Sequence, residues 1–85
     1  MITANLIKAK RTEAGLSQRD LGLAVGFQGI AAAQIISNIE RAKCLPPRER
    51  VSKFAKVLKT DVKEIYQAML ADEMDRLEEK YKGLV

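Results

Sequence analysis

The sequence predicts an all-α fold, in which five helices form one small domain and the last helix extends beyond it. Apolar residues recur at three- and four-residue spacing through most of the chain. Residues typical of helix starts and helix ends divide this pattern into five segments. No segment combines apolar–polar alternation with enrichment in β-branched residues, so no sheet is expected.

The first two helices are expected at Asn5–Ala14 and Ser17–Val25. Thr3 or Asn5 could cap the first helix, and Ser17 with Asp20 three residues later forms a capping box for the second. The second helix has one apolar stripe, formed by Leu21, Ala24 and Val25.

The third helix is expected to end near Arg41 and to have two different faces. Ile36 and Ile39 are three residues apart and can both face the core. The opposite side carries Gln34, Ser37, Asn38 and Arg41. Side chains that both donate and accept hydrogen bonds, ordered on one helix face, can read base edges. The alternative for this face is ordinary contact with solvent.

The fourth helix is expected to open at Pro47, because proline is tolerated in a first helical turn. Its core face is formed by Val51, Phe54, Ala55, Val57 and Leu58. Asp61 and Glu64 suggest a second capping box, and the fifth helix then meets no breaker before Gly83. The first part of this helix should close the core through Val62, Ile65, Tyr66 and Met69.

Beyond residue 66 the fifth helix has a heptad pattern. Spacings of four and three separate Leu70, Met74, Leu77, Tyr81 and Leu84. One small domain cannot cover so long a seam, so we expect residues 67–85 to form a dimerisation extension of a domain at 1–66. An antiparallel pair could place Glu73 opposite Lys80, and the alternative is a frayed tail.

The composition limits the possible functions. The chain has 85 residues, one cysteine (Cys44) and no histidine, so no internal disulfide, zinc site or Cys–His catalytic pair is expected. No run reaches the roughly 18 apolar residues of a membrane span, and the first residues lack the apolar core of a secretory signal. We therefore expect a cytoplasmic protein without cofactor or membrane association, and not an enzyme.

The net charge of +4 is unevenly distributed. Eleven basic and four acidic residues up to Thr60 give +7, whereas four basic and seven acidic residues from Asp61 onward give −3. A basic body with an acidic end is typical of a polyanion-binding domain joined to a segment with another role.

The motifs resemble the Cro/repressor (XRE-type) helix-turn-helix family over roughly residues 6–65. The matching residues are Arg11, Gly15–Leu21, Gly26-Phe27, Ile36–Arg41, Pro46 or Pro47, Phe54-Ala55 and Leu58. The resemblance implies a lambda-repressor-like DNA-binding domain whose third helix enters the major groove of double-stranded DNA, with dimers reading half-sites about 34 Å apart.

The resemblance also assigns roles to individual residues. Gln34 and Asn38 fall at base-reading positions with Ser37 close by, and Gln18 matches a glutamine that binds phosphate and braces the reading helix. Arg11 and Glu40 match a largely buried ion pair. The candidate phosphate contacts are Arg19, Arg41, Lys43 and Arg48, and Gln28 and Ala33 are further candidate DNA contacts.

Two features depart from the family pattern. About four extra residues lie between Gly26 and Glu40, and the alanine run favours added helix, with Ile30 dipping into the core. Ala42 stands where the family often has glycine, so the end of the third helix could be built differently.

Two functions therefore remain open from the sequence. The first is a transcriptional regulator that binds an operator as a homodimer. The second is an antitoxin-like interaction module that uses the C-terminal helix to bind a partner protein.

Overall fold

The computed structural model describes residues 1–81, with Tyr81 described by its backbone only. Five α-helices and one 3₁₀ turn make up this part of the chain, and it contains no strand. The elements are α1 (Ile2–Glu13), α2 (Gln18–Ala24), α3 (Ala31–Glu40), η1 (Arg48–Arg50), α4 (Val51–Leu58) and α5 (Val62–Tyr81). The predicted all-α fold is confirmed.

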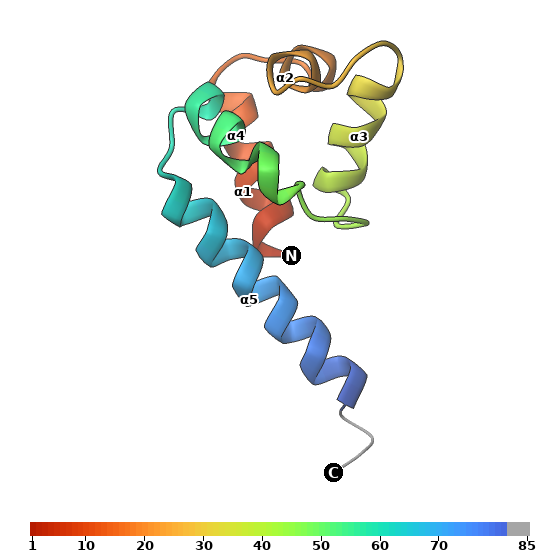
Figure 1. Cartoon of the computed structure of the whole chain (residues 1–85), viewed down its shortest axis with the longest axis vertical. Coiled ribbons are helices and arrows are strands. Elements are labelled where there is room, and N and C mark those ends of the chain that lie inside the picture. Colours follow the sequence, from red (N-terminus) through yellow and green to blue (C-terminus); the bar gives the residue numbers. More distant parts are fainter. Residues whose placement is uncertain (82–85) are drawn as a thin grey trace.

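The helices form a body from which the last helix projects. Helices α2 and α3 lie at one end of the body, and α5 starts beside α4, passes the N-terminus and continues away from the other helices (Figure 1). The molecule is therefore elongated, with principal extents of 44 × 26 × 21 Å.

Every α-helix contributes to a single core. The buried side chains at its centre come from all five: Ile7, Leu21, Val25, Ile36, Ile39, Val51, Phe54, Ala55, Leu58, Ile65 and Met69. This core fixes α3 against α1 and α2, so the orientation of its outer face depends on the whole body.

The first helix begins at Ile2, three residues earlier than predicted, and neither Thr3 nor Asn5 caps it. The cap comes from α5 instead. The Asp72 carboxylate accepts hydrogen bonds from the backbone N–H groups of Ile2 (2.9 Å) and Thr3 (2.8 Å). Asp72 is buried, although it belongs to the acidic C-terminal part of the chain. Burial alone would raise the pKa of Asp72, but the polar groups of Thr3, the Ile2 N–H and the N-terminal charge together lower it.

The second helix has the predicted capping box. Ser17 Oγ accepts from the Asp20 N–H at 2.9 Å, and the Asp20 carboxylate accepts from the Ser17 N–H at 3.3 Å. The predicted stripe is wrong at Ala24, which is exposed, because Gly22 is buried in its place. A Cβ at Gly22 would collide with the backbone of Ala32, so the missing side chain lets α2 and α3 approach closely.

The extra residues before α3 divide between loop and helix. Residues 31–33 add one turn to α3, as the alanine run predicted, whereas Gln28, Gly29 and Ile30 belong to the loop. Ile30 is 97% exposed, so the expectation that it dips into the core is wrong. The expectation rested only on the apolar character of Ile30. The loop turns outward at the preceding residue, Gly29, which has a φ of +66°.

The last two helices differ from expectation at their starts. Pro47 precedes the 3₁₀ turn η1, and α4 begins only at Val51. The reciprocal capping box of α5 is not formed, because Asp61 accepts from the Lys63 N–H and Glu64 accepts from the Thr60 hydroxyl. Helix α5 is continuous through residue 66, and its packing on the body reaches Asp72.

Candidate nucleic-acid interface

The inner face of α3 is held by apolar packing. Ile36 and Ile39 are buried as predicted, and Ala32 packs against Gly22 of α2. These contacts cover three successive turns of the helix, so its opposite face is directed away from the body.

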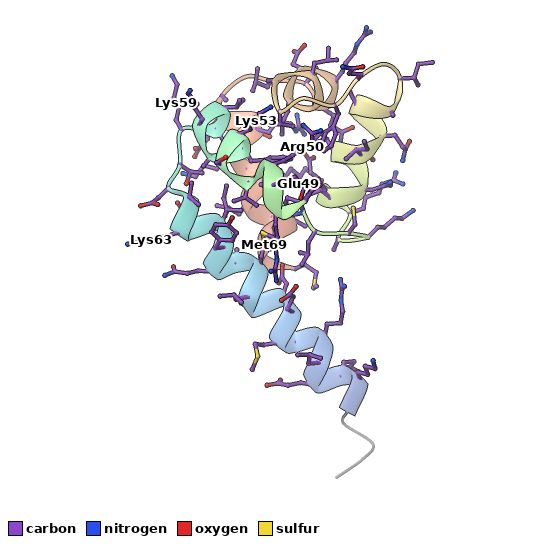
Figure 2. All side chains as sticks on the ribbon, in the orientation of Figure 1. Glu49, Arg50, Lys53, Lys59, Lys63 and Met69 are labelled. Atoms are coloured by element: carbon purple, nitrogen blue, oxygen red, sulfur yellow. The ribbon has the colours of Figure 1, made fainter. Side chains whose placement is uncertain are left out.

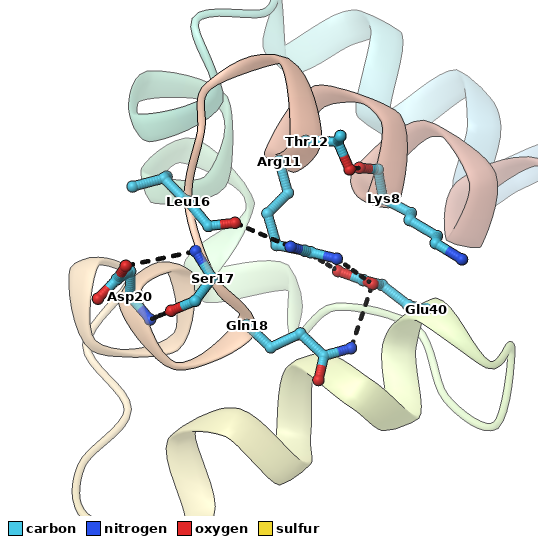
Figure 3. A network of polar contacts seen from close by, with 8 residues as sticks. All are labelled: Lys8, Arg11, Thr12, Leu16, Ser17, Gln18, Asp20 and Glu40. Carbon is cyan, nitrogen blue, oxygen red and sulfur yellow. Dashed lines mark hydrogen bonds and ion pairs between the residues drawn. The ribbon is translucent and has the colours of Figure 1, made fainter.

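A buried ion pair joins the end of α3 to α1 (Figure 3). Arg11 Nε donates to Glu40 Oε2 at 2.6 Å and Arg11 Nη2 donates to Oε1 at 3.1 Å. The side chains are only 16% and 4% exposed, respectively. The hydrogen bond to Glu40 is the largest reason why the pKa of Arg11 is raised, with the attraction of the Glu40 charge adding to it against the effect of burial. The structure thus brings together the two residues that the resemblance paired.

The same ion pair also forms hydrogen bonds with α2 and with the loop that precedes α2. Gln18 donates from its amide nitrogen to Glu40 Oε1 at 3.3 Å, and Arg11 Nη1 donates to the Leu16 carbonyl at 2.8 Å (Figure 3). Gln18 therefore links the first turn of α2 to the last turn of α3, which is the position of a bracing residue.

The outer face of α3 carries the amide side chains. Gln34 is exposed, and Ser37 and Asn38 are half-buried. Gln34 Nε2 donates to Asn38 Oδ1 at 3.0 Å, so the two amides are ordered relative to each other. The bond uses one of several donors and acceptors on each amide, and each retains polar atoms for another partner.

The four candidate phosphate contacts are all exposed but lie in two places. Arg19, Arg41 and Lys43 are exposed on the first turn of α2 and just after the end of α3. Arg48 is also exposed but lies beside α5, in a groove shared with Tyr66, Met69, Leu70 and Glu73. The structure does not bring Arg48 together with the other basic candidates.

The remaining two candidate DNA contacts lie near the start of α3. Gln28 is exposed in the loop, and Ala33 is half-buried on the first turn of the helix. Ala33 lines a hollow together with Arg19, Gly29 and Ile30.

The end of α3 has the geometry of a glycine-type cap although the residue is alanine. Ala42 has a φ of +61°. The Lys43 N–H donates to the Asn38 carbonyl at 2.9 Å and the Ala42 N–H to the Ile39 carbonyl at 3.1 Å, which is a Schellman motif. The expectation of a differently built end is therefore wrong, since the backbone keeps the left-handed residue at the cost of strain.

Arg50 is a structural residue that the sequence analysis missed. It donates to the carbonyl of Val25 at the end of α2 (2.8 Å) and lies over the Phe27 ring, 4.7 Å from its centroid. Arg50 and Lys53, both labelled in Figure 2, come close to Gly26, where an added side chain would collide with the Arg50 guanidinium group. Only the packing of α4 on α2 brings these residues together, so no local signal could have found them.

The far half of α5 exposes apolar side chains. Leu70, Met74 and Leu77 are 59%, 57% and 48% exposed, and Tyr66, which was expected in the core, is 39% exposed. The side chain of Tyr81 and the whole of Leu84 lie outside the described residues. The described residues of the predicted seam thus form one uncovered stripe.

Other kinds of site find no support in the described residues. No group of three histidine, cysteine, aspartate or glutamate side chains within residues 1–81 could hold a metal ion. Within the same residues, no helix has the length and apolarity needed to cross a bilayer.

Two short helices joined by a loop, here residues 25–30, with the polar face of the second helix exposed, define the helix-turn-helix class. In agreement, a family model described as Helix-turn-helix matches residues 7–65. The chain belongs to this family, the Cro/repressor (XRE-type) helix-turn-helix domains, which are DNA-binding regulatory domains. No match was found among curated proteins or among solved structures.

Proposed function

We propose that the protein is a sequence-specific transcriptional regulator that acts in the cytoplasm and binds an operator as a homodimer. The observation that carries this proposal is the outer face of α3, where the Gln34 and Asn38 amides are accessible and mutually ordered. A helix fits the major groove of B-DNA, in which each base pair presents a distinct pattern of donors and acceptors.

The amides supply the sequence reading. A glutamine or asparagine amide can donate to N7 and accept from N6 of adenine. A good bidentate contact of this kind discriminates against the wrong base by about 1–3 kcal/mol. The bond between Gln34 and Asn38 restricts both side chains before DNA arrives, which lowers the entropy lost on binding.

The basic side chains supply affinity without sequence preference. Arg19 lies at the start of α2, and Arg41 and Lys43 lie at the end of α3, so positive charge flanks the reading face on two sides. Phosphate contacts of this kind fix the orientation of a protein on the duplex.

The exposed stripe of α5 supports dimerisation. A second copy would cover Leu70, Met74 and Leu77 in an antiparallel pair, with Met74 of each chain facing Leu77 of the other. In the same register Glu73 of each chain would lie next to Lys80 of the other, so a pair of opposite charges would flank the apolar contacts twice.

The experiment for DNA reading is selection of bound sequences from a random DNA pool by the full chain at about 50 mM salt. We expect enrichment of an inverted repeat with half-sites about one helical turn apart. Asn38→Ala should relax the enriched sequence at one base step, whereas Lys43→Ala should weaken binding to all sequences alike. Absence of enrichment would contradict the proposal.

The experiment for the dimer uses Leu77→Glu, which places a charge in the stripe. The matched control is Arg76→Gln, which changes the net charge by the same one unit at an exposed position on another side of α5. We expect sedimentation to show a dimer for the control and a monomer for Leu77→Glu. A dimer that persists in Leu77→Glu would contradict pairing through this stripe.

A second candidate function uses the same stripe to bind a different protein, with the helix-turn-helix body as a scaffold. Salt dependence separates the two candidates. A DNA-binding protein that neutralises six to ten phosphates loses roughly 10³–10⁵ in affinity between 50 and 200 mM salt, whereas an apolar helix contact is much less sensitive.

A further inference from the structure

The most exposed large apolar side chain in the described residues is Ile30. It is 97% exposed, whereas the next, Leu70, is 59% exposed and belongs to the stripe of α5. The side chain therefore makes almost no packing contact with its own chain, and the core does not explain its position.

Ile30 extends the reading face of α3 by one turn. It is the N-cap of that helix and already has helical dihedral angles, with φ −63° and ψ −30°. Spacings of four, four and three residues lead from Ile30 to Gln34, Asn38 and Arg41, so all four share one side of the helix. The same face thus carries an apolar group at its N-terminal end and amides in its middle.

The surroundings of Ile30 suit a nucleic acid. Ile30 lines a hollow together with Gly29, Ala33 and Arg19. Glycine and alanine leave room for a close approach, and Arg19 supplies a cation for the phosphate backbone next to it.

The chemistry of the side chain restricts what it can recognise. Isoleucine has no hydrogen-bond donor or acceptor, so it can bind neither a phosphate nor a polar base edge. Among the unmodified bases, only thymine presents an apolar group in the major groove, its 5-methyl. We infer that Ile30 is a specificity-determining residue that contacts the 5-methyl group of a thymine. This inference rests on the proposed DNA-reading function.

The test removes the methyl group alone. Once an operator has been selected, each thymine in one half-site is replaced in turn by deoxyuridine, and affinity is measured for the wild-type chain and for Ile30→Ala. For the wild type we expect one position at which loss of the methyl weakens binding about fourfold per half-site, the effect of one buried methyl group. For Ile30→Ala we expect this penalty to disappear.

A matched variant separates this contact from a general loss of affinity. Gln34→Ala should bind more weakly overall and yet keep the deoxyuridine penalty, because its side chain lies one turn further along α3. Since Ile30 is almost fully exposed, Ile30→Ala should melt at the wild-type temperature.

Two results would overturn the inference. One is the absence of any penalised thymine in the wild type, and the other is a penalty of the same size in Ile30→Ala. Both require an operator to have been selected, so they differ from failure of the proposed function, in which no sequence is enriched.

Discussion

Removal of the Glu40 carboxylate should destabilise the fold more than an ordinary surface substitution. The Arg11 side chain is only 16% exposed, and in Glu40→Ala its guanidinium loses two hydrogen bonds and keeps its bond to the Leu16 carbonyl. Gln18 loses its acceptor at the same time. The variant therefore leaves a buried positive charge without its counter-ion.

The expected magnitude follows from this burial. Breaking a buried pair by removal of one partner costs about 3–5 kcal/mol, because the remaining charge has lost water and no longer has an opposite charge beside it. In a domain of this size each kcal/mol lowers Tm by about 4–8 °C, so Tm should fall by at least about 12 °C.

The assay is thermal unfolding followed by circular dichroism at pH 7. The matched control is Glu13→Ala, which removes the same side chain from an exposed contact with Lys10 at 3.9 Å and should shift Tm by only a few degrees. A double-mutant cycle with Arg11→Ala should show a combined loss well below the sum of the single losses. Additive losses, or equal shifts for Glu40→Ala and Glu13→Ala, would refute the reasoning.

Three further substitutions test individual elements by the same melting assay. Gly22→Ala should destabilise by about 1–3 kcal/mol, because the added Cβ meets the backbone of Ala32, and a wild-type Tm would show that the helices can separate freely. Ala42→Gly should raise stability by about 0.5–1 kcal/mol through relief of its positive φ, whereas Ala9→Gly, on the exposed side of α1, should lower it by a similar amount. Asp72→Asn should cost about 1.5–3 kcal/mol at pH 7, since it weakens charge-assisted hydrogen bonds to the first turn of α1. Because the folded pKa of Asp72 is lowered, its contribution is present above the ordinary carboxyl pKa near 3.9 and is lost as pH falls through the folded value. The difference between wild type and Asp72→Asn should therefore shrink in acid, and a difference that is constant down to pH 2 would contradict this account.

The helix-turn-helix motif was predictable because its sequence signals are local. The capping box of α2 joins residues three apart, and the inward isoleucines of α3 follow from helical periodicity. Such signals depend on the helix alone, so they survive whatever the rest of the chain does. The pairing of Arg11 with Glu40 came from the family resemblance, since no local rule joins residues 29 apart.

The wrong burial predictions came from contacts between distant segments of the chain. Periodicity shows which residues share a helix face, but it does not show which part of that face another helix covers. Ala24 and Tyr66 were expected to be buried and are exposed, whereas Gly22 and Asp72 are buried at contacts with α3 and α1.

Helix propensity, capping and charge are properties of neighbouring residues, so the helices, the basic body and the side chains proposed to contact DNA could be found from the order of residues alone. Three features required the folded molecule: a carboxylate from α5 caps α1, Arg50 supports the end of α2, and Ile30 lies on the outside. Hydrogen bonds and burial between segments up to 70 residues apart depend on how the helices pack, and packing is a property of the whole chain.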